Sequence, residues 1–329
     1  MKILITGGAG FIGHNTAISL KKAGFNVTVL DNLKRSTDFA IKKLSKHKIP
    51  ILKGDILNTR TLNNALKNID IVIHAAAYIN VEESTKKPTL YLKNNTLGTA
   101  SIAKNCLDKG IKLLIYLSSA AVYGEPKKLP INENHPTNPI SPYGLSKLMG
   151  EDIIKFYSKK GLKYITLRIF NAYGPGQNTA YAGVITKFIE RATKKLPPII
   201  HGDGEQTRDF IHVNDISEAI KLTIEKKIAN ETFNIGSGTP TKINDLANLI
   251  IKLTNLNRKP IYTKPKPGDI KHSYADTSKA KRLLGFKPKI NLKEGLKNLI
   301  QNLQENKTYI ENLKTKNPNF KIQKLSEIL

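Results

Sequence analysis

Several features that would point to other classes of protein are scarce or missing in this sequence. Cys106 is the only cysteine, so the chain cannot form an internal disulfide, and we expect a buried apolar residue in a cytoplasmic protein. No apolar run approaches the roughly 20 residues of a membrane-spanning helix, and residues 1–6 already have the pattern of a strand. We therefore expect neither a membrane segment nor a signal peptide. The seven histidines lack the spacing of metal ligands, and we predict no metal site.

Acidic residues are also few. The sequence has 26 aspartates and glutamates against 53 lysines and arginines, which gives a formal net charge of +27 at pH 7. Such an excess can indicate binding to nucleic acid or to a membrane surface. The lysines are dispersed, however, and no long basic run is interleaved with aromatic residues, so we expect no specific nucleic-acid partner. A positive field of this kind should instead attract an anionic substrate, and salt should weaken that attraction.

Short apolar runs of strand length recur along the chain. They alternate with helical patterns, which is typical of an α/β protein with a buried parallel sheet. With 329 residues, 40% of them hydrophobic, the chain is long enough to bury a large core. The runs are residues 1–6, 25–30, 69–73, 113–117, 164–169 and 232–235.

A glycine-rich turn joins the first two of these runs. Gly7, Gly10 and Gly13 lie between the first strand and an apolar stripe with helical spacing, and the next strand ends at Asp31. In such a unit, glycines let the backbone approach a pyrophosphate at the helix N-terminus. A carboxylate after the second strand can bind the adenosine ribose and would repel a 2′-phosphate, which favours NAD over NADP. The alternative is an ordinary glycine-rich turn beside a surface carboxylate.

Tyr143 and Lys147 form a second candidate constellation. They are four positions apart, so on a helix their side chains project from one face. Ser141 suits the N-cap and Pro142 the first turn, which predicts that a helix begins here. A helix N-terminus and an ammonium group would both stabilise the phenolate of Tyr143, since the usual tyrosine pKa of about 10 is too high for a general base at neutral pH. The alternative is a chance or structural pair, because this spacing is common on amphipathic helices.

Together these motifs resemble the short-chain dehydrogenase/reductase superfamily, and specifically its extended branch of NAD-dependent nucleotide-sugar epimerases and dehydratases. The similarity extends from residue 1 to about residue 300, and the further matching segments are residues 54–56, 74–77, 95–99, 117–124, 168–175 and 202–211. The resemblance implies an α/β fold with a Rossmann-like doubly wound parallel sheet and a smaller, interleaved C-terminal α/β substrate domain. It predicts an NAD-binding domain at 1–170 plus about 209–236, a nucleotide-sugar domain at about 171–208 plus 237–300, and a tail at 301–329 with a surface helix and a loosely ordered end.

The resemblance also implies the roles of individual residues. Tyr143 would take a proton from the sugar 4-hydroxyl while hydride passes from C4 to NAD, Ser119 would orient the reacting oxygen, and Lys147 would hold the phenolate. Ser119 follows the strand that we expect at residues 112–118, and Ser118 is its competitor for this role. Asn95 would support the cofactor and the lysine. The cofactor-binding residues implied in this way are Gly7, Gly10, Phe11, Ile12, Gly13, Asp31, Asn32, Asp55, Ile56, Ala75, Ala76, Ala77, Asn95, Tyr143 and Lys147.

Residues of the second half would hold the nucleotide sugar. Arg208 matches a family arginine that clamps the UDP diphosphate, Asn171 a position beside the diphosphate and hexose, and Asp269 a carboxylate on the uridine ribose. Lys266 stands where the family usually has arginine, which keeps the charge and loses the bidentate geometry. Ser273 replaces a bulky tyrosine of some relatives and leaves room for a 2-acetamido group. Ser119 and Tyr143 complete the expected substrate site.

The residues after Ser119 separate the reactions of the family. Dehydratases carry an Asp-Glu pair there, whereas this chain has Ala120 and Ala121. The resemblance therefore implies 4-epimerisation of a UDP-sugar with tightly bound NAD, on a plain hexose or an N-acetylhexosamine. The alternatives are another NAD-dependent nucleotide-sugar enzyme, such as one acting on UDP-glucuronate, and a non-catalytic NAD- or RNA-binding protein. Family members commonly form homodimers through two helices, here those after Asn95 and Tyr143.

Overall fold

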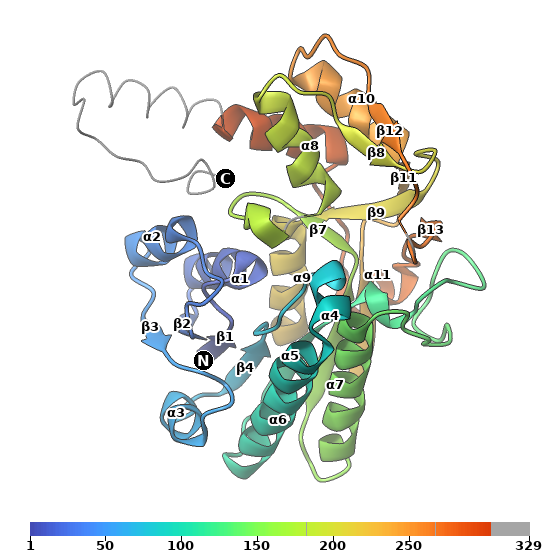
Figure 1. Cartoon of the computed structure of the whole chain (residues 1–329). Coiled ribbons are helices and arrows are strands. Elements are labelled where there is room, and N and C mark those ends of the chain that lie inside the picture. Colours follow the sequence, from blue (N-terminus) through green and yellow to red (C-terminus); the bar gives the residue numbers. More distant parts are fainter. Residues whose placement is uncertain (182, 267, 304–329) are drawn as a thin grey trace, which may run out of the picture.

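A parallel sheet between two layers of helices forms the centre of the fold (Figure 1). A computed structural model provides the structure and describes residues 1–181, 183–266 and 268–303. Within these residues, seven strands pair in parallel in the order β10-β6-β5-β4-β1-β2-β3. The strand order reverses between β1 and β4, the place at which open sheets of this kind bind ligands. The strands are β1 Lys2–Thr6, β2 Asn26–Asp31, β3 Ile51–Lys53, β4 Ile71–His74, β5 Leu113–Ser119, β6 Tyr164–Ile169 and β10 Glu231–Ile235.

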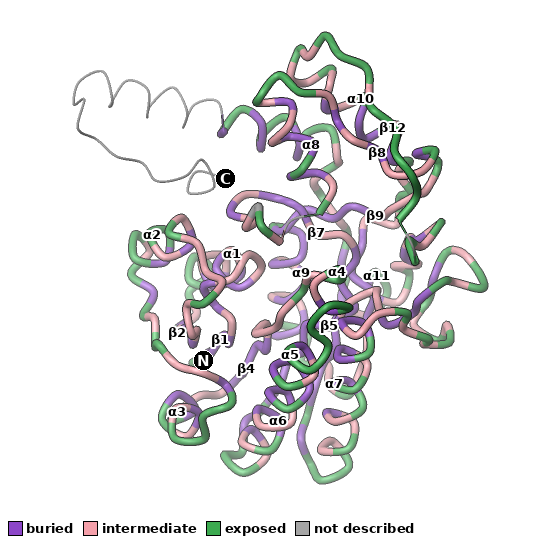
Figure 2. Tube along the Cα trace, in the orientation of Figure 1, coloured by how far each residue is buried: buried purple, intermediate pink, exposed green. Residues whose placement is uncertain are grey.

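Successive side chains of each central strand are buried on opposite faces of the sheet, which explains why the strand sequences are almost continuously apolar. In β1, Ile3 and Ile5 join one hydrophobic cluster while Leu4 joins another, and in β4 Ile73 and Val72 divide in the same way. Successive side chains point to opposite faces of a sheet, and here helices cover both faces, so most positions are apolar on either face. The resulting buried interior follows the strands in Figure 2.

Each face of the sheet has its own set of helices. The cluster that contains Ile3 also includes side chains of α1 (Phe11–Lys22), α2 (Asp38–Lys46), α9 (Val213–Glu225) and α11 (Ser278–Leu284). The cluster that contains Leu4 includes side chains of α3 (Thr59–Ala65), α6 (Gly98–Asp108) and α7 (Pro142–Ser158). Cys106 is fully buried in α6, which confirms that prediction. The doubly wound parallel sheet predicted from the sequence is therefore present.

Local signals set the ends of the helices that border the site. Ser141 caps α7 by accepting a hydrogen bond from Gly144 N at 3.1 Å, and Pro142 is its first residue, as predicted. Gly24 follows α1 with φ of +88°, a left-handed conformation that suits glycine. The strand expected at residues 112–118 lies one residue further along the chain, because β5 runs from Leu113 to Ser119.

A smaller sheet forms the second part of the molecule, above the large sheet in Figure 1. Strand β9 (Thr207–His212) pairs in parallel with β7 (Asn171–Tyr173) and β13 (His272–Ser273), and antiparallel with β11 (Pro240–Lys242). Strand β8 (Ile199–His201) pairs with β12 (Ile261–Thr263). Helix α8 (Val184–Thr193), helix α10 (Ile243–Leu253) and the helical residues 292–303 share one apolar cluster with these strands. The sequence predicts that the chain re-enters the NAD-binding domain at about residue 209. Strand β9 instead pairs within the smaller sheet, and α9 is the next element that packs against the large sheet.

Short elements lie at the carboxyl ends of the central strands. They are α4 (Val81–Lys86), α5 (Pro88–Tyr91), the π-helix η1 (Leu92–Leu97), and the 3₁₀-helices η2 (Ala120–Val122) and η3 (Thr179–Tyr181). Within the part of the chain that the structure describes, no helix combines the length and apolar character needed to cross a membrane. The tail predicted at residues 301–329 falls outside the described residues from position 304 onward.

Candidate active site

The glycine turn after β1 leaves room for backbone and little else. Gly7 has φ of +66°, and a Cβ placed on it would lie 2.6 Å from the N and Cα atoms of Ala76. A Cβ on Gly13 would collide with the carbonyl oxygen of Gly7. Gly10 is the N-cap of α1, and in the described structure no side chain caps this helix and no acidic residue occupies its first turn. Backbone N–H groups and the positive end of the helix dipole can therefore receive an anion, which fits the pyrophosphate of NAD.

Asp31 lies beside this turn at the end of β2. Its carboxylate accepts hydrogen bonds from Ala9 N at 3.0 Å and Leu33 N at 2.8 Å. Burial raises the pKa of the carboxyl group, and the two backbone bonds oppose that change. Asn32 donates to Asp55 Oδ2 at 3.1 Å, so the ends of β2 and β3 meet at one edge of the sheet. The structure thus brings Asp31, Asn32 and Asp55 together in an arrangement that could hold an adenosine ribose.

Most of the other expected cofactor residues border the same turn, whereas the side chain of Ile56 is buried in the core. Ala75, Ala76 and Ala77 continue from β4, and Ala75 N donates to Thr6 O at 3.0 Å. Ile56, by contrast, is buried in the hydrophobic cluster of Leu4, so only its backbone could face a ligand. The remaining two, Phe11 and Ile12, begin α1.

The three expected catalytic residues meet where β5 ends against α7. Ser119 is the last residue of β5, and its hydroxyl is close enough to that of Tyr143 to lower the pKa of the phenol. Lys147 lies one turn further along α7 and donates from Nζ to the Leu117 carbonyl oxygen at 2.8 Å. Both helix residues are buried, with Tyr143 9% and Lys147 4% exposed. Ser118 points elsewhere, to Glu151 Oε1 at 2.6 Å, which favours Ser119 as the hydroxyl beside Tyr143.

Burial dominates the electrostatics of this pair. It raises the pKa of Tyr143, and the nearby Ser119 hydroxyl only partly opposes that effect. It also lowers the pKa of Lys147 to about 7, against a raising effect of the Glu151 carboxylate. The expectation that the helix and the ammonium group would together lower the pKa of Tyr143 was therefore wrong for this state. Burial disfavours the charged form of both the phenol and the amine, and the Lys147 ammonium group donates to the Leu117 carbonyl oxygen.

Asn95 connects the loop after β4 to α7. Its side chain accepts from Tyr78 N at 2.8 Å and donates to Tyr78 O at 2.9 Å and to Ser146 Oγ at 3.0 Å. Ser146 is the residue before Lys147, so the amide holds the helix beside the lysine in place. The π-helix η1 carries Asn95, and such local irregularities are frequent at functional sites.

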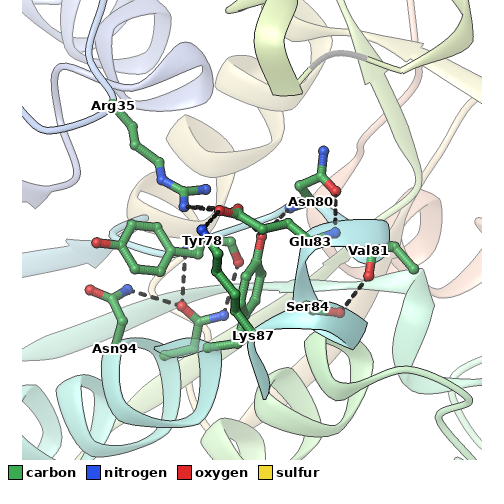
Figure 3. Close-up of polar contacts among 10 residues, drawn as sticks. Arg35, Tyr78, Asn80, Val81, Glu83, Ser84, Lys87 and Asn94 are labelled. Atoms are coloured by element: carbon green, nitrogen blue, oxygen red, sulfur yellow. Dashed lines mark hydrogen bonds and ion pairs between the residues drawn. The ribbon is translucent and has the colours of Figure 1, made fainter. Parts of the chain in front are cut away.

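An ionic cluster above this loop was missed in the sequence (Figure 3). Arg35 Nη2 lies 2.8 Å from Glu83 Oε2, and its guanidinium carbon lies 3.8 Å from the ring centre of Tyr78. The same carbon lies 4.4 Å from the ring centre of Tyr181. Glu83 also accepts from Tyr91 Oη at 2.8 Å. Arg35 follows β2 and Tyr78 follows β4, so the cluster joins the two loops that border the glycine turn. No motif links these residues, because the pairs form only through the tertiary fold.

Most residues expected to hold the nucleotide sugar also lie together. Arg208 Nη2 contacts Asp269 Oδ1 at 2.5 Å, and Ser273 pairs with Arg208 between β13 and β9. Asn171 on β7 donates to Asp209 O at 3.2 Å. Lys266 joins them through its carbonyl oxygen, which accepts from Asp269 N at 3.2 Å. Since Arg208 and Asp269 are bound to each other, a diphosphate would have to compete with the carboxylate for the guanidinium group.

The segment after Ser119 contributes no acid or base of its own. It forms the 3₁₀-helix η2, with Ser119 as N-cap accepting from Ala121 N at 3.2 Å. Across residues 1–181, 183–266 and 268–303, no three histidine, cysteine, aspartate or glutamate side chains are grouped so that they could hold a metal ion. The chemistry that the described side chains support is therefore proton transfer by Tyr143 beside a dinucleotide site.

Comparison with known proteins agrees with this geometry. A family model described as the NAD dependent epimerase/dehydratase family matches residues 3–236. The chain belongs to this family. A protein named putative UDP-glucose 4-epimerase from Methanocaldococcus jannaschii is 41% identical over 309 residues, which cover 92% of this chain and 99% of that protein. Family membership confirms NAD as the cofactor and the Rossmann-like fold.

Solved structures of the family superpose over almost the whole chain. A UDP-glucose 4-epimerase from Thermotoga maritima with UDP-glucose has a TM-score of 0.88 and 36% identity, covering 93% of this chain and 99% of that chain. A UDP-glucuronic acid 4-epimerase from Bacillus cereus, in complex with UDP-glucuronic acid and NAD, has a TM-score of 0.86 and 32% identity, covering 95% and 100%. The chain is therefore almost equally similar in fold to two enzymes that are named for different sugars.

Proposed function

We propose that the protein is a UDP-sugar 4-epimerase that interconverts UDP-glucose and UDP-galactose. The observation that carries this proposal is the contact of Ser119 with Tyr143 and the burial of Lys147 one turn away, followed by alanines at positions 120 and 121. The contact supplies a proton acceptor at one sugar oxygen. The alanines exclude the second acid or base that elimination from the same sugar would need.

The chain's own residues account for the proton movements. Tyr143 would accept the proton of the sugar 4-hydroxyl and later return it, with Ser119 hydrogen-bonded to the same oxygen. Lys147, when protonated, stabilises the phenolate that Tyr143 must form. The glycine turn and Asp31 would hold NAD, which when bound would supply the hydride acceptor for C4 and the donor for the return step. Rotation of the 4-keto sugar between the two transfers would present its other face and invert C4.

The nucleotide would lie on the smaller sheet. We assign the diphosphate to Arg208 and Asn171, and the uridine ribose to Asp269, because these groups lie together on and beside β7 and β9. Lys266 lies on the same loop as Asp269 and adds positive charge there. Ser273 is small and buried next to Arg208, which would leave space for a 2-acetamido group, so UDP-N-acetylglucosamine is a second candidate substrate.

UDP-glucuronate 4-epimerase is the competing function. It is supported by the close likeness to the Bacillus cereus enzyme. The assay that separates these possibilities incubates the purified protein, without added NAD, with UDP-galactose, UDP-N-acetylgalactosamine and UDP-glucuronate, and analyses the nucleotide sugars. We expect UDP-glucose from the first substrate. Product from UDP-glucuronate alone would favour the competing function, and no C4-epimer from any of them would sink the proposal.

We also propose a homodimer formed through α6 and α7. Large apolar side chains are exposed on or next to these helices, namely Leu97, Leu145, Met149 and Phe156, with 58%, 42%, 39% and 54% of their surface exposed. Exposed groups of this kind mark interaction surfaces. Sedimentation equilibrium of the wild-type protein and of Phe156→Glu tests this: we expect a dimer that the substitution weakens, whereas a wild-type monomer would contradict it.

A further inference from the structure

Three consecutive residues at the end of β5 each contact a different residue of α7. Leu117 O accepts from Lys147 Nζ, Ser118 Oγ donates to Glu151 Oε1, and the Ser119 hydroxyl interacts with that of Tyr143. The three helix residues are spaced at intervals of four, so they lie on one face of α7. The strand end and the helix are therefore held in register at three points, and Glu151 provides the point furthest from the reacting hydroxyl.

Glu151 is a buried charge held from two directions. Its side chain is 0% exposed. Arg168 donates to it from Nε at 3.0 Å and from Nη2 at 2.7 Å, a bidentate geometry, while Ser118 Oγ lies at 2.6 Å. Arg168 is on β6 directly beside Ser118 in the register of the sheet. The carboxylate thus connects α7 to two neighbouring strands.

Arg168 is itself held in place by hydrogen bonds from the guanidinium nitrogen that does not contact Glu151. Its Nη1 donates to Tyr123 Oη at 3.0 Å and to Glu133 O at 3.1 Å. Tyr123 Oη in turn donates to Asn234 Oδ1 at 2.6 Å. Such a network of satisfied buried groups is rigid, and it transmits little movement to the residues that it positions.

We propose that Glu151 is a positioning residue for the epimerisation, which holds the end of β5 that carries Ser119 against the face of α7 that carries Tyr143 and Lys147. The inference rests on the proposed function and extends it to a residue that has no contact with substrate. Glu151 acts through Ser118 on the strand end that carries Ser119, and through its charge on Lys147 one turn away. A stabilising ion pair alone would do neither.

The charge effect follows from the groups around Lys147. Tyr143 and Glu151 flank it on α7, the Tyr116 ring centre on β5 lies 5.0 Å from Nζ, and His74 on β4 is close enough to interact electrostatically. Burial lowers the pKa of His74 to about 3, so this ring is neutral at pH 7. Glu151 is therefore the negative charge that raises the pKa of Lys147 against burial. Without it that pKa falls further, and Lys147 loses its proton at a lower pH.

Glu151 has its own charged and titratable neighbours. Arg168 on β6 pairs with it, and Tyr116 on β5 and Tyr164 on β6 interact with it electrostatically. Burial raises the pKa of both tyrosines, and the negative charge of Glu151 raises it further, so both stay neutral in the working range. Neither tyrosine supplies a charge that could replace Glu151 beside Lys147.

The test compares Glu151→Gln with Ser118→Ala in the holoenzyme. For Glu151→Gln we expect kcat to fall about ten-fold or more with KM changed less than about three-fold, and the alkaline limb of the kcat profile to move to lower pH. For Ser118→Ala we expect a fall in kcat with the alkaline limb in place, because the charge is retained. NAD released on denaturation of each variant is measured to show that cofactor is still bound.

Two further variants keep the test decisive. Asp215→Asn is the matched control, because Asp215 is also a buried carboxylate and accepts from Lys289 N at 3.0 Å and Ile290 N at 3.1 Å away from the site. If Glu151→Gln fails to fold, Glu151→Gln/Arg168→Met removes the unpaired buried charge and takes its place. An active wild type whose Glu151 variants match Asp215→Asn in kcat and pH profile overturns the positioning role alone. An inactive wild type overturns the proposed function and this role with it.

Discussion

Replacing Tyr143 by phenylalanine should strongly reduce turnover and leave the fold intact. The hydroxyl is the group that would accept the proton from the sugar, and positioned acid–base groups contribute about 10²–10⁴-fold to rate. We therefore expect kcat to fall by about that factor. The fold should survive because the side chain keeps its ring and because the partner hydroxyl of Ser119 still accepts from Ala121 N at 3.2 Å.

The size of the stability change follows from the same contacts. One hydrogen bond between neutral groups contributes about 1 kcal/mol, and no charged group loses a partner. The free energy of unfolding, measured by denaturant titration, should thus change by about 1 kcal/mol or less. Tyr157→Phe, the same substitution near the other end of α7, is the matched control and should retain wild-type turnover.

The assay is epimer formation from UDP-galactose, with NAD content measured on the same samples. A Tyr143→Phe protein that binds NAD and keeps more than a tenth of wild-type kcat would refute the assignment of the proton acceptor. Loss of activity accompanied by loss of NAD would instead mean that Tyr143 acts by holding the cofactor.

Three other substitutions test the cofactor and nucleotide sites. Gly7→Ala would force a Cβ onto the backbone of Ala76 at positive φ, and we expect loss of about 1–3 kcal/mol in unfolding free energy and little NAD in the purified protein; normal NAD content would contradict the fit. Arg208→Lys keeps the charge but loses the planar guanidinium group, which contacts Asp269 through Nη2 and would hold a diphosphate, so KM for UDP-sugar should rise about ten-fold or more while NAD content is unchanged. Arg35→Met breaks the link between the loops around the glycine turn, and NAD should dissociate faster, measured by nucleotide exchange, with kcat restored at saturating NAD; an unchanged exchange rate would exclude a role in retention.

The parts of the fold that the sequence predicts well are those set by near neighbours. The first strand, glycine turn and helix depend on a few residues in a row, and Ser141 and Pro142 define where α7 begins. The proximity of Ser119 to Tyr143 also agrees with the expectation, because carboxyl ends of parallel strands meet at one edge of the sheet.

The parts that it predicts poorly depend on tertiary structure. Arg35 and Glu83 are 48 residues apart, and Ser118 and Glu151 are 33 apart, so no local pattern announces these pairs. The pKa of Tyr143 was misjudged because the helix and the lysine are visible in the sequence, whereas burial is not. No strand is predicted at Thr207–His212, because its sequence has few apolar residues and the partners of β9 lie far away in the chain.

The central claim is that hydride leaves C4 and returns to the same sugar. UDP-galactose carrying deuterium at C4 tests it most directly, in ordinary water and without added NAD. The account predicts UDP-glucose that keeps the deuterium at C4, with no 4-keto sugar accumulating. Loss of the label to solvent, or release of a keto product, would contradict it.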